Sequence, residues 1–104
     1  MTLEEFRATL VQEKAPEGSS PALRAMWQDA KGNWNEAHAI AQEIEDKTGS
    51  WIHAYLHRKE GDLANAGYWY RRAGQSMEDG PLTAEWDRIV LNILGAGATV
   101  LDDK

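Results

Sequence analysis

Two hexapeptides carry the clearest structural signal in this chain: GNWNEA at residues 32–37 and GDLANA at residues 61–66. When one copy is shifted by 29 positions onto the other, Ala25 falls on Ala54 and Ala37 falls on Ala66. Small residues at recurring positions let helix backbones approach closely, while large apolar residues between them fill the gaps. The repeat therefore predicts two similar units that pack side by side.

The first two residues of each hexapeptide predict a turn between two helices. Glycine readily adopts the left-handed conformation found just past a helix end, so we expect Gly32 and Gly61 each to end a helix. The next residue, Asn33 or Asp62, is a favoured N-cap, and Glu36 stands three residues after Asn33, close to a capping box. Each unit is therefore predicted to be an αα-hairpin.

The second unit resembles part of a tetratricopeptide repeat (TPR). Residues 61–73, GDLANAGYWYRRA, are similar to the second half of that repeat. The matching turn and packing positions are Ala54, Gly61, Ala66, Tyr70 and Ala73 in the second unit, and Ala25, Gly32, Trp34 and Ala37 in the first. The spacing of 29 residues is shorter than the roughly 34 of that family. The resemblance implies a TPR-like α-α superhelix.

Hydrophobic periodicity and capping signals extend this architecture to the whole chain, residues 1–104. We expect a single all-α domain of about six helices, in which two TPR-like hairpins are flanked by a capping helix at each end. Repeat 1 covers about residues 20–48, repeat 2 about 50–76 and the C-terminal cap about 83–95. The individual helices are predicted at residues 3–13, 21–31, 34–47, 51–60, 63–75 and 83–95. For the tail, residues 96–104, two alternatives are open: it docks on the last helix or it is disordered.

The last predicted helix carries an apolar stripe at the spacing of one helix face. Its members are Trp86, Ile89, Val90, Ile93 and Leu94. Such a stripe must face either a core or a partner. A homo-oligomer that buries Trp86, Ile89, Val90 and Ile93 between copies is therefore one alternative.

The amino-acid composition limits the kinds of partner that we expect this protein to bind and where in the cell we expect it. The formal charge of −6 argues against nucleic acid and anionic membranes, which are bound chiefly through Lys and Arg. The chain has no cysteine, no stretch that resembles a signal peptide and no apolar run of the roughly 20 residues that span a bilayer. We expect a soluble, cytoplasmic protein.

The second hairpin is basic within this acidic chain, since residues 50–76 hold four Arg or Lys and two acids. The resemblance implies that the first helix of each unit lines a concave groove, where aromatic rings beside cations suit an acidic peptide or ligand. We therefore predict a non-catalytic protein–protein interaction module, with a partner surface of Met26, Trp51, Tyr55, Arg58, Lys59 and Arg72. The simpler alternative is that these cations pair with acids of the same chain, and that Arg71 and Arg72 form such pairs or stack on Trp69.

Two histidines, His53 and His57, stand four residues apart on one predicted helix face, and His38 is the only other histidine. Packing histidines are the simplest interpretation, but the three residues could also bind a metal or a small ligand. The second alternative is a small-molecule, anion or metal-binding protein, or an enzyme, that uses His53, His57 and Arg58. Because no motif for catalysis or for a cofactor is found, we predict neither an enzyme nor a cofactor.

Overall fold

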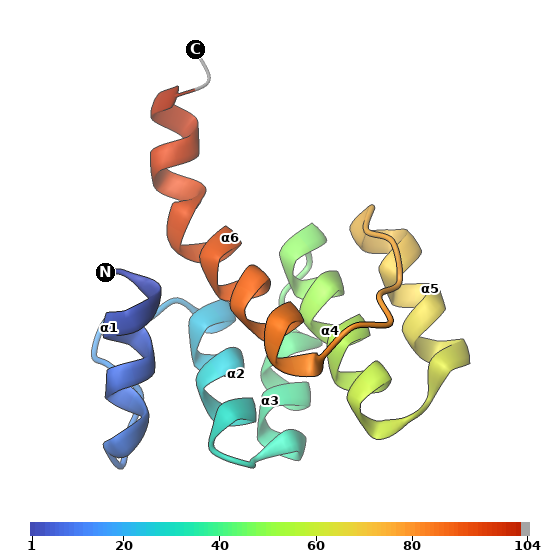
Figure 1. Ribbon diagram of the computed structural model, residues 1–104, viewed down its shortest axis with the longest axis horizontal. Coiled ribbons are helices and arrows are strands. Elements are labelled where there is room, and N and C mark those ends of the chain that lie inside the picture. The colour runs from blue at the N-terminus through green and yellow to red at the C-terminus, as the bar shows by residue number, and fades with distance from the viewer. Residues whose placement is uncertain (103–104) are drawn as a thin grey trace.

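The computed structural model describes the backbone of residues 1–102 and the side chains of residues 1–95, and this part of the chain contains helices and no strand. The elements are α1 (Leu3–Ala8), a 3-10 turn η1 (Thr9–Val11), α2 (Pro21–Ala30), α3 (Trp34–Ala41), α4 (Lys47–Glu60), α5 (Leu63–Ala73) and α6 (Leu82–Asp102) (Figure 1). The predicted all-α architecture of six helices is confirmed.

The two repeated glycines occupy the predicted hairpin turns. Gly32, with a φ of 87°, lies between α2 and α3, and Gly61, with a φ of 92°, lies between α4 and α5. Asp62 caps α5, because its side chain accepts a hydrogen bond from the backbone N–H of Asn65 at 3.2 Å. Asn33 is the N-cap residue of α3, as predicted, but it forms no capping box, because its side chain instead donates to Gln28 Oε1 at 2.8 Å.

The repeated alanines lie in the core that the two hairpins share. Ala25, Ala37, Ala54 and Ala66 are all fully buried. The helices of each hairpin pack against each other, and α3 packs against α4, so that the hairpins lie side by side (Figure 1). Small side chains at these positions let the four helix backbones approach closely.

The boundary between α3 and α4 differs from the prediction, in which one helix covered residues 34–47 and the next began at residue 51. The helix α3 ends at Ala41, and α4 is capped by Asp46, whose side chain accepts a hydrogen bond from the Gly49 N–H at 2.9 Å. Gly49 therefore lies in the first turn of α4, directly against Ile44. A Cβ atom on Gly49 would lie 2.2 Å from the Ile44 carbonyl oxygen, so only glycine fits there without a shift.

Three other helix ends also differ. The helix α1 gives way to the 3-10 turn after Ala8, and α5 ends at Ala73 because Gly74 adopts a φ of 73°. The predicted end of the last helix at Gly95 is wrong: this residue has no left-handed conformation, and α6 continues to Asp102. The question of whether the side chains of the tail, residues 96–104, dock on the last helix lies outside the described residues.

The helix α6 runs across α2 and α4 and also contacts α1, rather than extending the stack beyond α5 (Figure 1). Its stripe faces the chain's own core: Ile89 and Val90 are fully buried, Trp86 is 7% exposed, and Ile93 and Leu94 pack against the same core while partly exposed. In this conformation the stripe is not available between two copies. Among the described residues, no helix is both long and apolar enough to cross a bilayer.

Gly61→Ala tests whether the hairpin turn requires glycine. An added Cβ would meet nothing within 4 Å, so the cost comes only from the positive φ. We expect the free energy of unfolding in urea to fall by about 1–2 kcal/mol. Gly80→Ala is the control, since that site is equally open but lacks a positive φ. Equal losses in the two variants would contradict the prediction.

Candidate functional site

Five of the six predicted partner-binding residues lie on α2 and α4, but α6 covers most of them. Met26 is fully buried, and Tyr55 and Trp51 are 2% and 7% exposed. The sixth residue, Arg72, lies apart from them on α5, with its guanidinium 5.3 Å from the centre of the Trp69 ring. The stacking of Arg72 on this ring, predicted as its simpler role, is confirmed.

The centre of the covered surface is a carboxylate from α6. Glu85 is fully buried and accepts hydrogen bonds from Tyr70 Oη at 2.6 Å, Arg58 Nη1 at 2.9 Å and Trp51 Nε1 at 3.1 Å. A buried carboxylate is tolerated only when a counter-charge and hydrogen-bond donors replace the lost water. Burial raises the pKa of Tyr70, and its hydrogen bond to Glu85 raises the pKa further.

A second buried acid lies beside the first. Asp29 of α2 is 2% exposed and accepts hydrogen bonds from Tyr55 Oη at 2.8 Å and Lys59 Nζ at 2.9 Å. Burial raises the pKa of Tyr55, and the charge of Asp29 raises it further. Arg58 and Lys59 thus both pair with acids of their own chain, which is the simpler of the two roles that the sequence allows.

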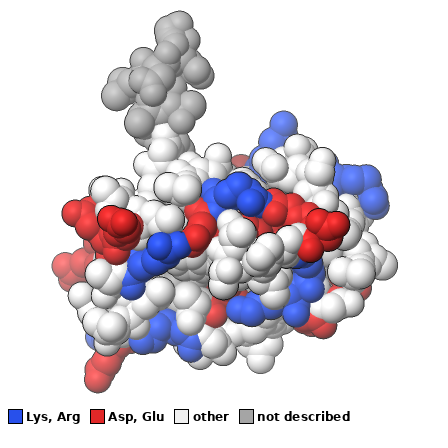
Figure 2. Space-filling model, viewed as in Figure 1, with Lys and Arg blue, Asp and Glu red and all other residues white. Residues whose placement is uncertain are grey.

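The charged residues at the surface also pair with one another. On the face shown in Figure 2, Lys and Arg lie next to Asp and Glu instead of forming one basic area. Arg7 of α1 pairs with Asp87 of α6, and Arg88 of α6 pairs with Glu78. One ion pair thus links α6 to α1, and another links it to the loop that precedes it.

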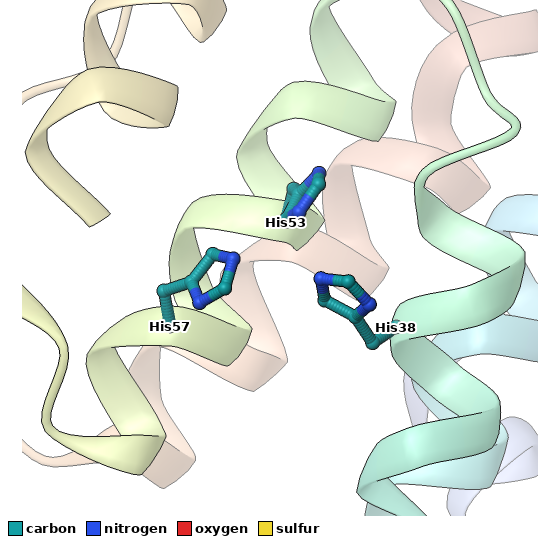
Figure 3. A group of neighbouring side chains, drawn as sticks. All are labelled: His38, His53 and His57. Atoms are coloured by element: carbon teal, nitrogen blue, oxygen red, sulfur yellow. The ribbon is translucent and has the colours of Figure 1, made fainter. Parts of the chain in front are cut away.

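The three histidines of the chain meet on another side of α4. His53 and His57 extend from α4, and His38 faces them from α3 (Figure 3). The ring centres are 4.5 Å apart for His38 and His53, 4.9 Å for His53 and His57, and 5.2 Å for His38 and His57. One ring nitrogen from each residue lies within 4.8 Å of the other two. We refer to these residues as the histidine cluster.

Two tryptophans hold the rings of the histidine cluster from opposite helices. Trp34 stacks on His38 with ring centres 4.9 Å apart, and Trp69 stacks on His53 at 4.0 Å. The rings of His53 and His57 are nearly enclosed, with exposures of 6% and 7%, while His38 is partly exposed. Stacking and burial together restrict the orientations that the imidazoles can adopt.

The hydrogen bonding of the histidine cluster is uneven. His57 Nδ1 lies 2.6 Å from Glu60 Oε1, but within the described part of the chain the rings of His38 and His53 make no hydrogen bond. Burial, followed by the charges of the other two histidines, lowers the pKa of His53 to about 4. Burial and the charge of His57 also lower the pKa of His38. The His53 ring is therefore neutral at pH 7, which leaves a nitrogen lone pair free to accept a proton or bind a metal.

Sequence reasoning found the histidines but not the two buried acids. Glu85 stands four residues before Ile89 and directly before Trp86, so helical spacing places it beside the apolar stripe. Its place beside the apolar stripe was the sequence signal for burial of Glu85, because an acid that faces solvent is expected on the opposite face of the helix. The TPR resemblance implies that Asp29 lines the same groove as Met26 and Tyr55, but it does not predict that the Asp29 side chain is buried.

Comparison of the chain with known family models, with curated proteins and with solved structures finds no match in any of the three. The TPR resemblance therefore stays a prediction from the sequence.

Glu85→Gln tests the buried carboxylate with little change in size. The substitution leaves the Arg58 charge buried without its counter-ion and places an amide N–H₂ among donors. We expect the free energy of unfolding in urea to fall by about 3 kcal/mol. Glu78→Gln, at the more exposed pair with Arg88, is the matched control and should cost less than about 1 kcal/mol. Similar losses of unfolding free energy in the two variants would show that the buried Glu85 carboxylate stabilises the fold no more than the exposed pair does.

The lowered pKa of His53 predicts a pH dependence of stability. Between pH 6.5, its ordinary pKa, and about 4, the unfolded chain binds a proton at this residue that the folded chain does not. The contribution of His53 is thus fully present above pH 6.5 and is lost as the pH falls toward 4. We expect the unfolding free energy of wild type to fall more steeply over this interval than that of His53→Asn. The measurement is urea unfolding at several pH values. If the unfolding free energies of the two proteins change in parallel with pH, the prediction is wrong.

Proposed function

We propose that this chain is a non-catalytic interaction module that binds an amphipathic helix bearing an acidic residue next to its apolar stripe. The binding surface, here called the helix-binding face, consists of Met26, Trp51, Tyr55, Arg58 and Lys59. The observation that carries the proposal is the burial of Glu85 on this face, because α6 is itself a helix of that kind.

The contacts of α6 define the chemistry of the proposed ligand. The Glu85 carboxylate takes donors from two aromatic residues and one arginine, which are charge-assisted hydrogen bonds of the stronger class. The neighbouring residue, Trp86, donates from Nε1 to the Met26 carbonyl oxygen at 3.0 Å. One turn later, Ile89 and Val90 are fully buried. The preferred ligand is therefore a helix with an acid and an aromatic residue in sequence, followed by aliphatic residues one turn on.

The connection to α5 explains how α6 acts as a resident ligand. Residues 74–81, which join the two helices, contain neither helix nor strand. A short tether holds a ligand at a high effective concentration, so a free helix must compete with α6 for the face. Partner binding is then an exchange of helices. A partner helix binds only if it can outcompete α6 for the helix-binding face.

A competition experiment tests this proposal with the full chain. The probe is a fluorescently labelled peptide of residues 82–95, and the chain carries Trp86→Ala, which weakens the resident helix but leaves every residue of the helix-binding face unchanged. Loss of a buried tryptophan costs about 3–5 kcal/mol, so the resident helix should compete far less well. We expect fluorescence anisotropy to show at least about tenfold tighter peptide binding to this variant than to wild type.

The matched control is the same peptide with Glu85→Gln, which should bind the Trp86→Ala chain at least about tenfold more weakly because the carboxylate is gone. Far-UV circular dichroism of each chain checks that the total helix content is retained. Equal affinity of wild type and the variant for the peptide, or equal affinity of the two peptides for the variant, would reject the helix-binding face.

A further inference from the structure

We propose that the histidine cluster binds one divalent transition-metal ion, for which Zn²⁺ is the best match. This site is separate from the helix-binding face and does not depend on it. The chain contains three histidines in all, and the fold brings every one of them to the same place from two helices. In Figure 3, one ring nitrogen of His38 and one of His57 are turned toward the space between the three side chains.

The distances require only a small adjustment to bind an ion. Zinc takes imidazole nitrogens at about 2.0–2.1 Å, so a tetrahedral ion holds two such nitrogens about 3.3–3.4 Å apart. The three ring nitrogens already lie within 4.8 Å of one another. His53 and His57 are separated by one helical turn, a spacing from which two histidines of one helix can bind the same zinc. Small changes in the side-chain torsions of the three histidines would bring their nitrogens to the spacing that the ion requires.

The cluster has ring nitrogens that no protein group uses. Within the described residues, the rings of His38 and His53 make no hydrogen bond. No buried side-chain nitrogen or oxygen among those residues lacks a partner, so the unused ring nitrogens are reached by solvent and are open to a ligand. The Trp34 and Trp69 rings cover imidazole faces and offer no acceptor to the ring nitrogens. A metal ion would use these nitrogens where the protein itself does not.

Glu60 supplies the support that metal-binding histidines usually have. Its carboxylate lies 2.6 Å from His57 Nδ1, so this nitrogen carries the proton and Nε2 keeps its lone pair for the ion. A carboxylate that accepts from the other nitrogen of a ligand histidine fixes the orientation of the ring and makes it a stronger donor. Glu60 is therefore assigned as a positioning residue rather than a ligand.

The set of donors selects the kind of metal. Three neutral imidazoles suit Zn²⁺ and other late first-row ions, whereas Mg²⁺ and Ca²⁺ require oxygen ligands. Thiolate ligands are excluded because the chain has no cysteine. Three protein ligands leave the fourth position of a tetrahedron to water or another small molecule, as in open zinc sites. Because the ligands come from α3 and α4, the ion would also bind the first hairpin to the second.

A second group of possible ligands shares one member with the cluster: His57, Glu60 and Asp62. Both acids in this group are exposed and already engaged, Glu60 with His57 and Asp62 with the backbone and side chain of Asn65. The histidine cluster is better enclosed and has unused nitrogens, so we assign the ion to it. The two assignments differ in their dependence on His38 and Asp62.

Isothermal titration of the metal-free full chain with ZnCl₂ tests the proposal. We expect one ion per chain in wild type. His38→Asn and His53→Asn should each weaken binding by more than about 100-fold, and Glu60→Ala by about tenfold, as is usual for the outer partner of a ligand histidine. Asp62→Asn is the control: asparagine still caps α5, and affinity should remain unchanged.

A second measurement does not depend on how the variants fold. In the NMR spectrum of wild type, the ring signals of all three histidines should shift together as zinc is added, and saturate at one equivalent. Four results would overturn the site: no zinc binding by wild type, binding retained in His38→Asn, binding lost in Asp62→Asn, or zinc bound while the ring signals stay in place.

Discussion

The fold depends most on the placement of one charged group, the Glu85 carboxylate, inside the core. Hydrophobic contact is non-directional, so the apolar stripe of α6 specifies the position of this helix on α2 and α4 less sharply than a hydrogen-bonded group does. The carboxylate permits no such freedom, because it must lie within reach of Arg58, Trp51 and Tyr70 at once. Those three residues come from α4 and α5, so a single side chain sets the position of α6 against the second hairpin.

The hairpins were predictable because their signals are local. A glycine followed by a cap residue, Gly61 and Asp62, specifies the end of one helix and the start of the next within a few residues. The α3–α4 boundary was not predictable in the same way, because Asp46 and Ser50 are both acceptable N-caps. The structure selects Asp46, since the close approach of Gly49 to Ile44 lets the chain turn early.

The functional residues were also only partly predictable, because their contacts join residues that are far apart in the sequence. Helical spacing alone predicts that His53 and His57 share one face of α4. The position of His38 beside them depends on how α3 packs on α4. The cations Arg58 and Lys59 were visible as a basic segment, yet their partners lie 27 and 30 residues away along the chain. Periodicity tells which face of a helix is buried. It does not tell which element covers that face, and here the covering element is α6.

The helix α4 joins the two proposed sites while keeping them apart. Trp51 and Tyr55 point to α6 and its neighbours, whereas His53 and His57 meet α3 and Trp69, so the same helix presents a different set of side chains to each side. An ion in the histidine cluster would restrain α4 against α3 without touching a partner of Glu85. Coupling between the sites then requires movement of α4 as a whole, and a helix packed on both sides resists such movement. Metal binding and helix exchange are therefore expected to be nearly independent.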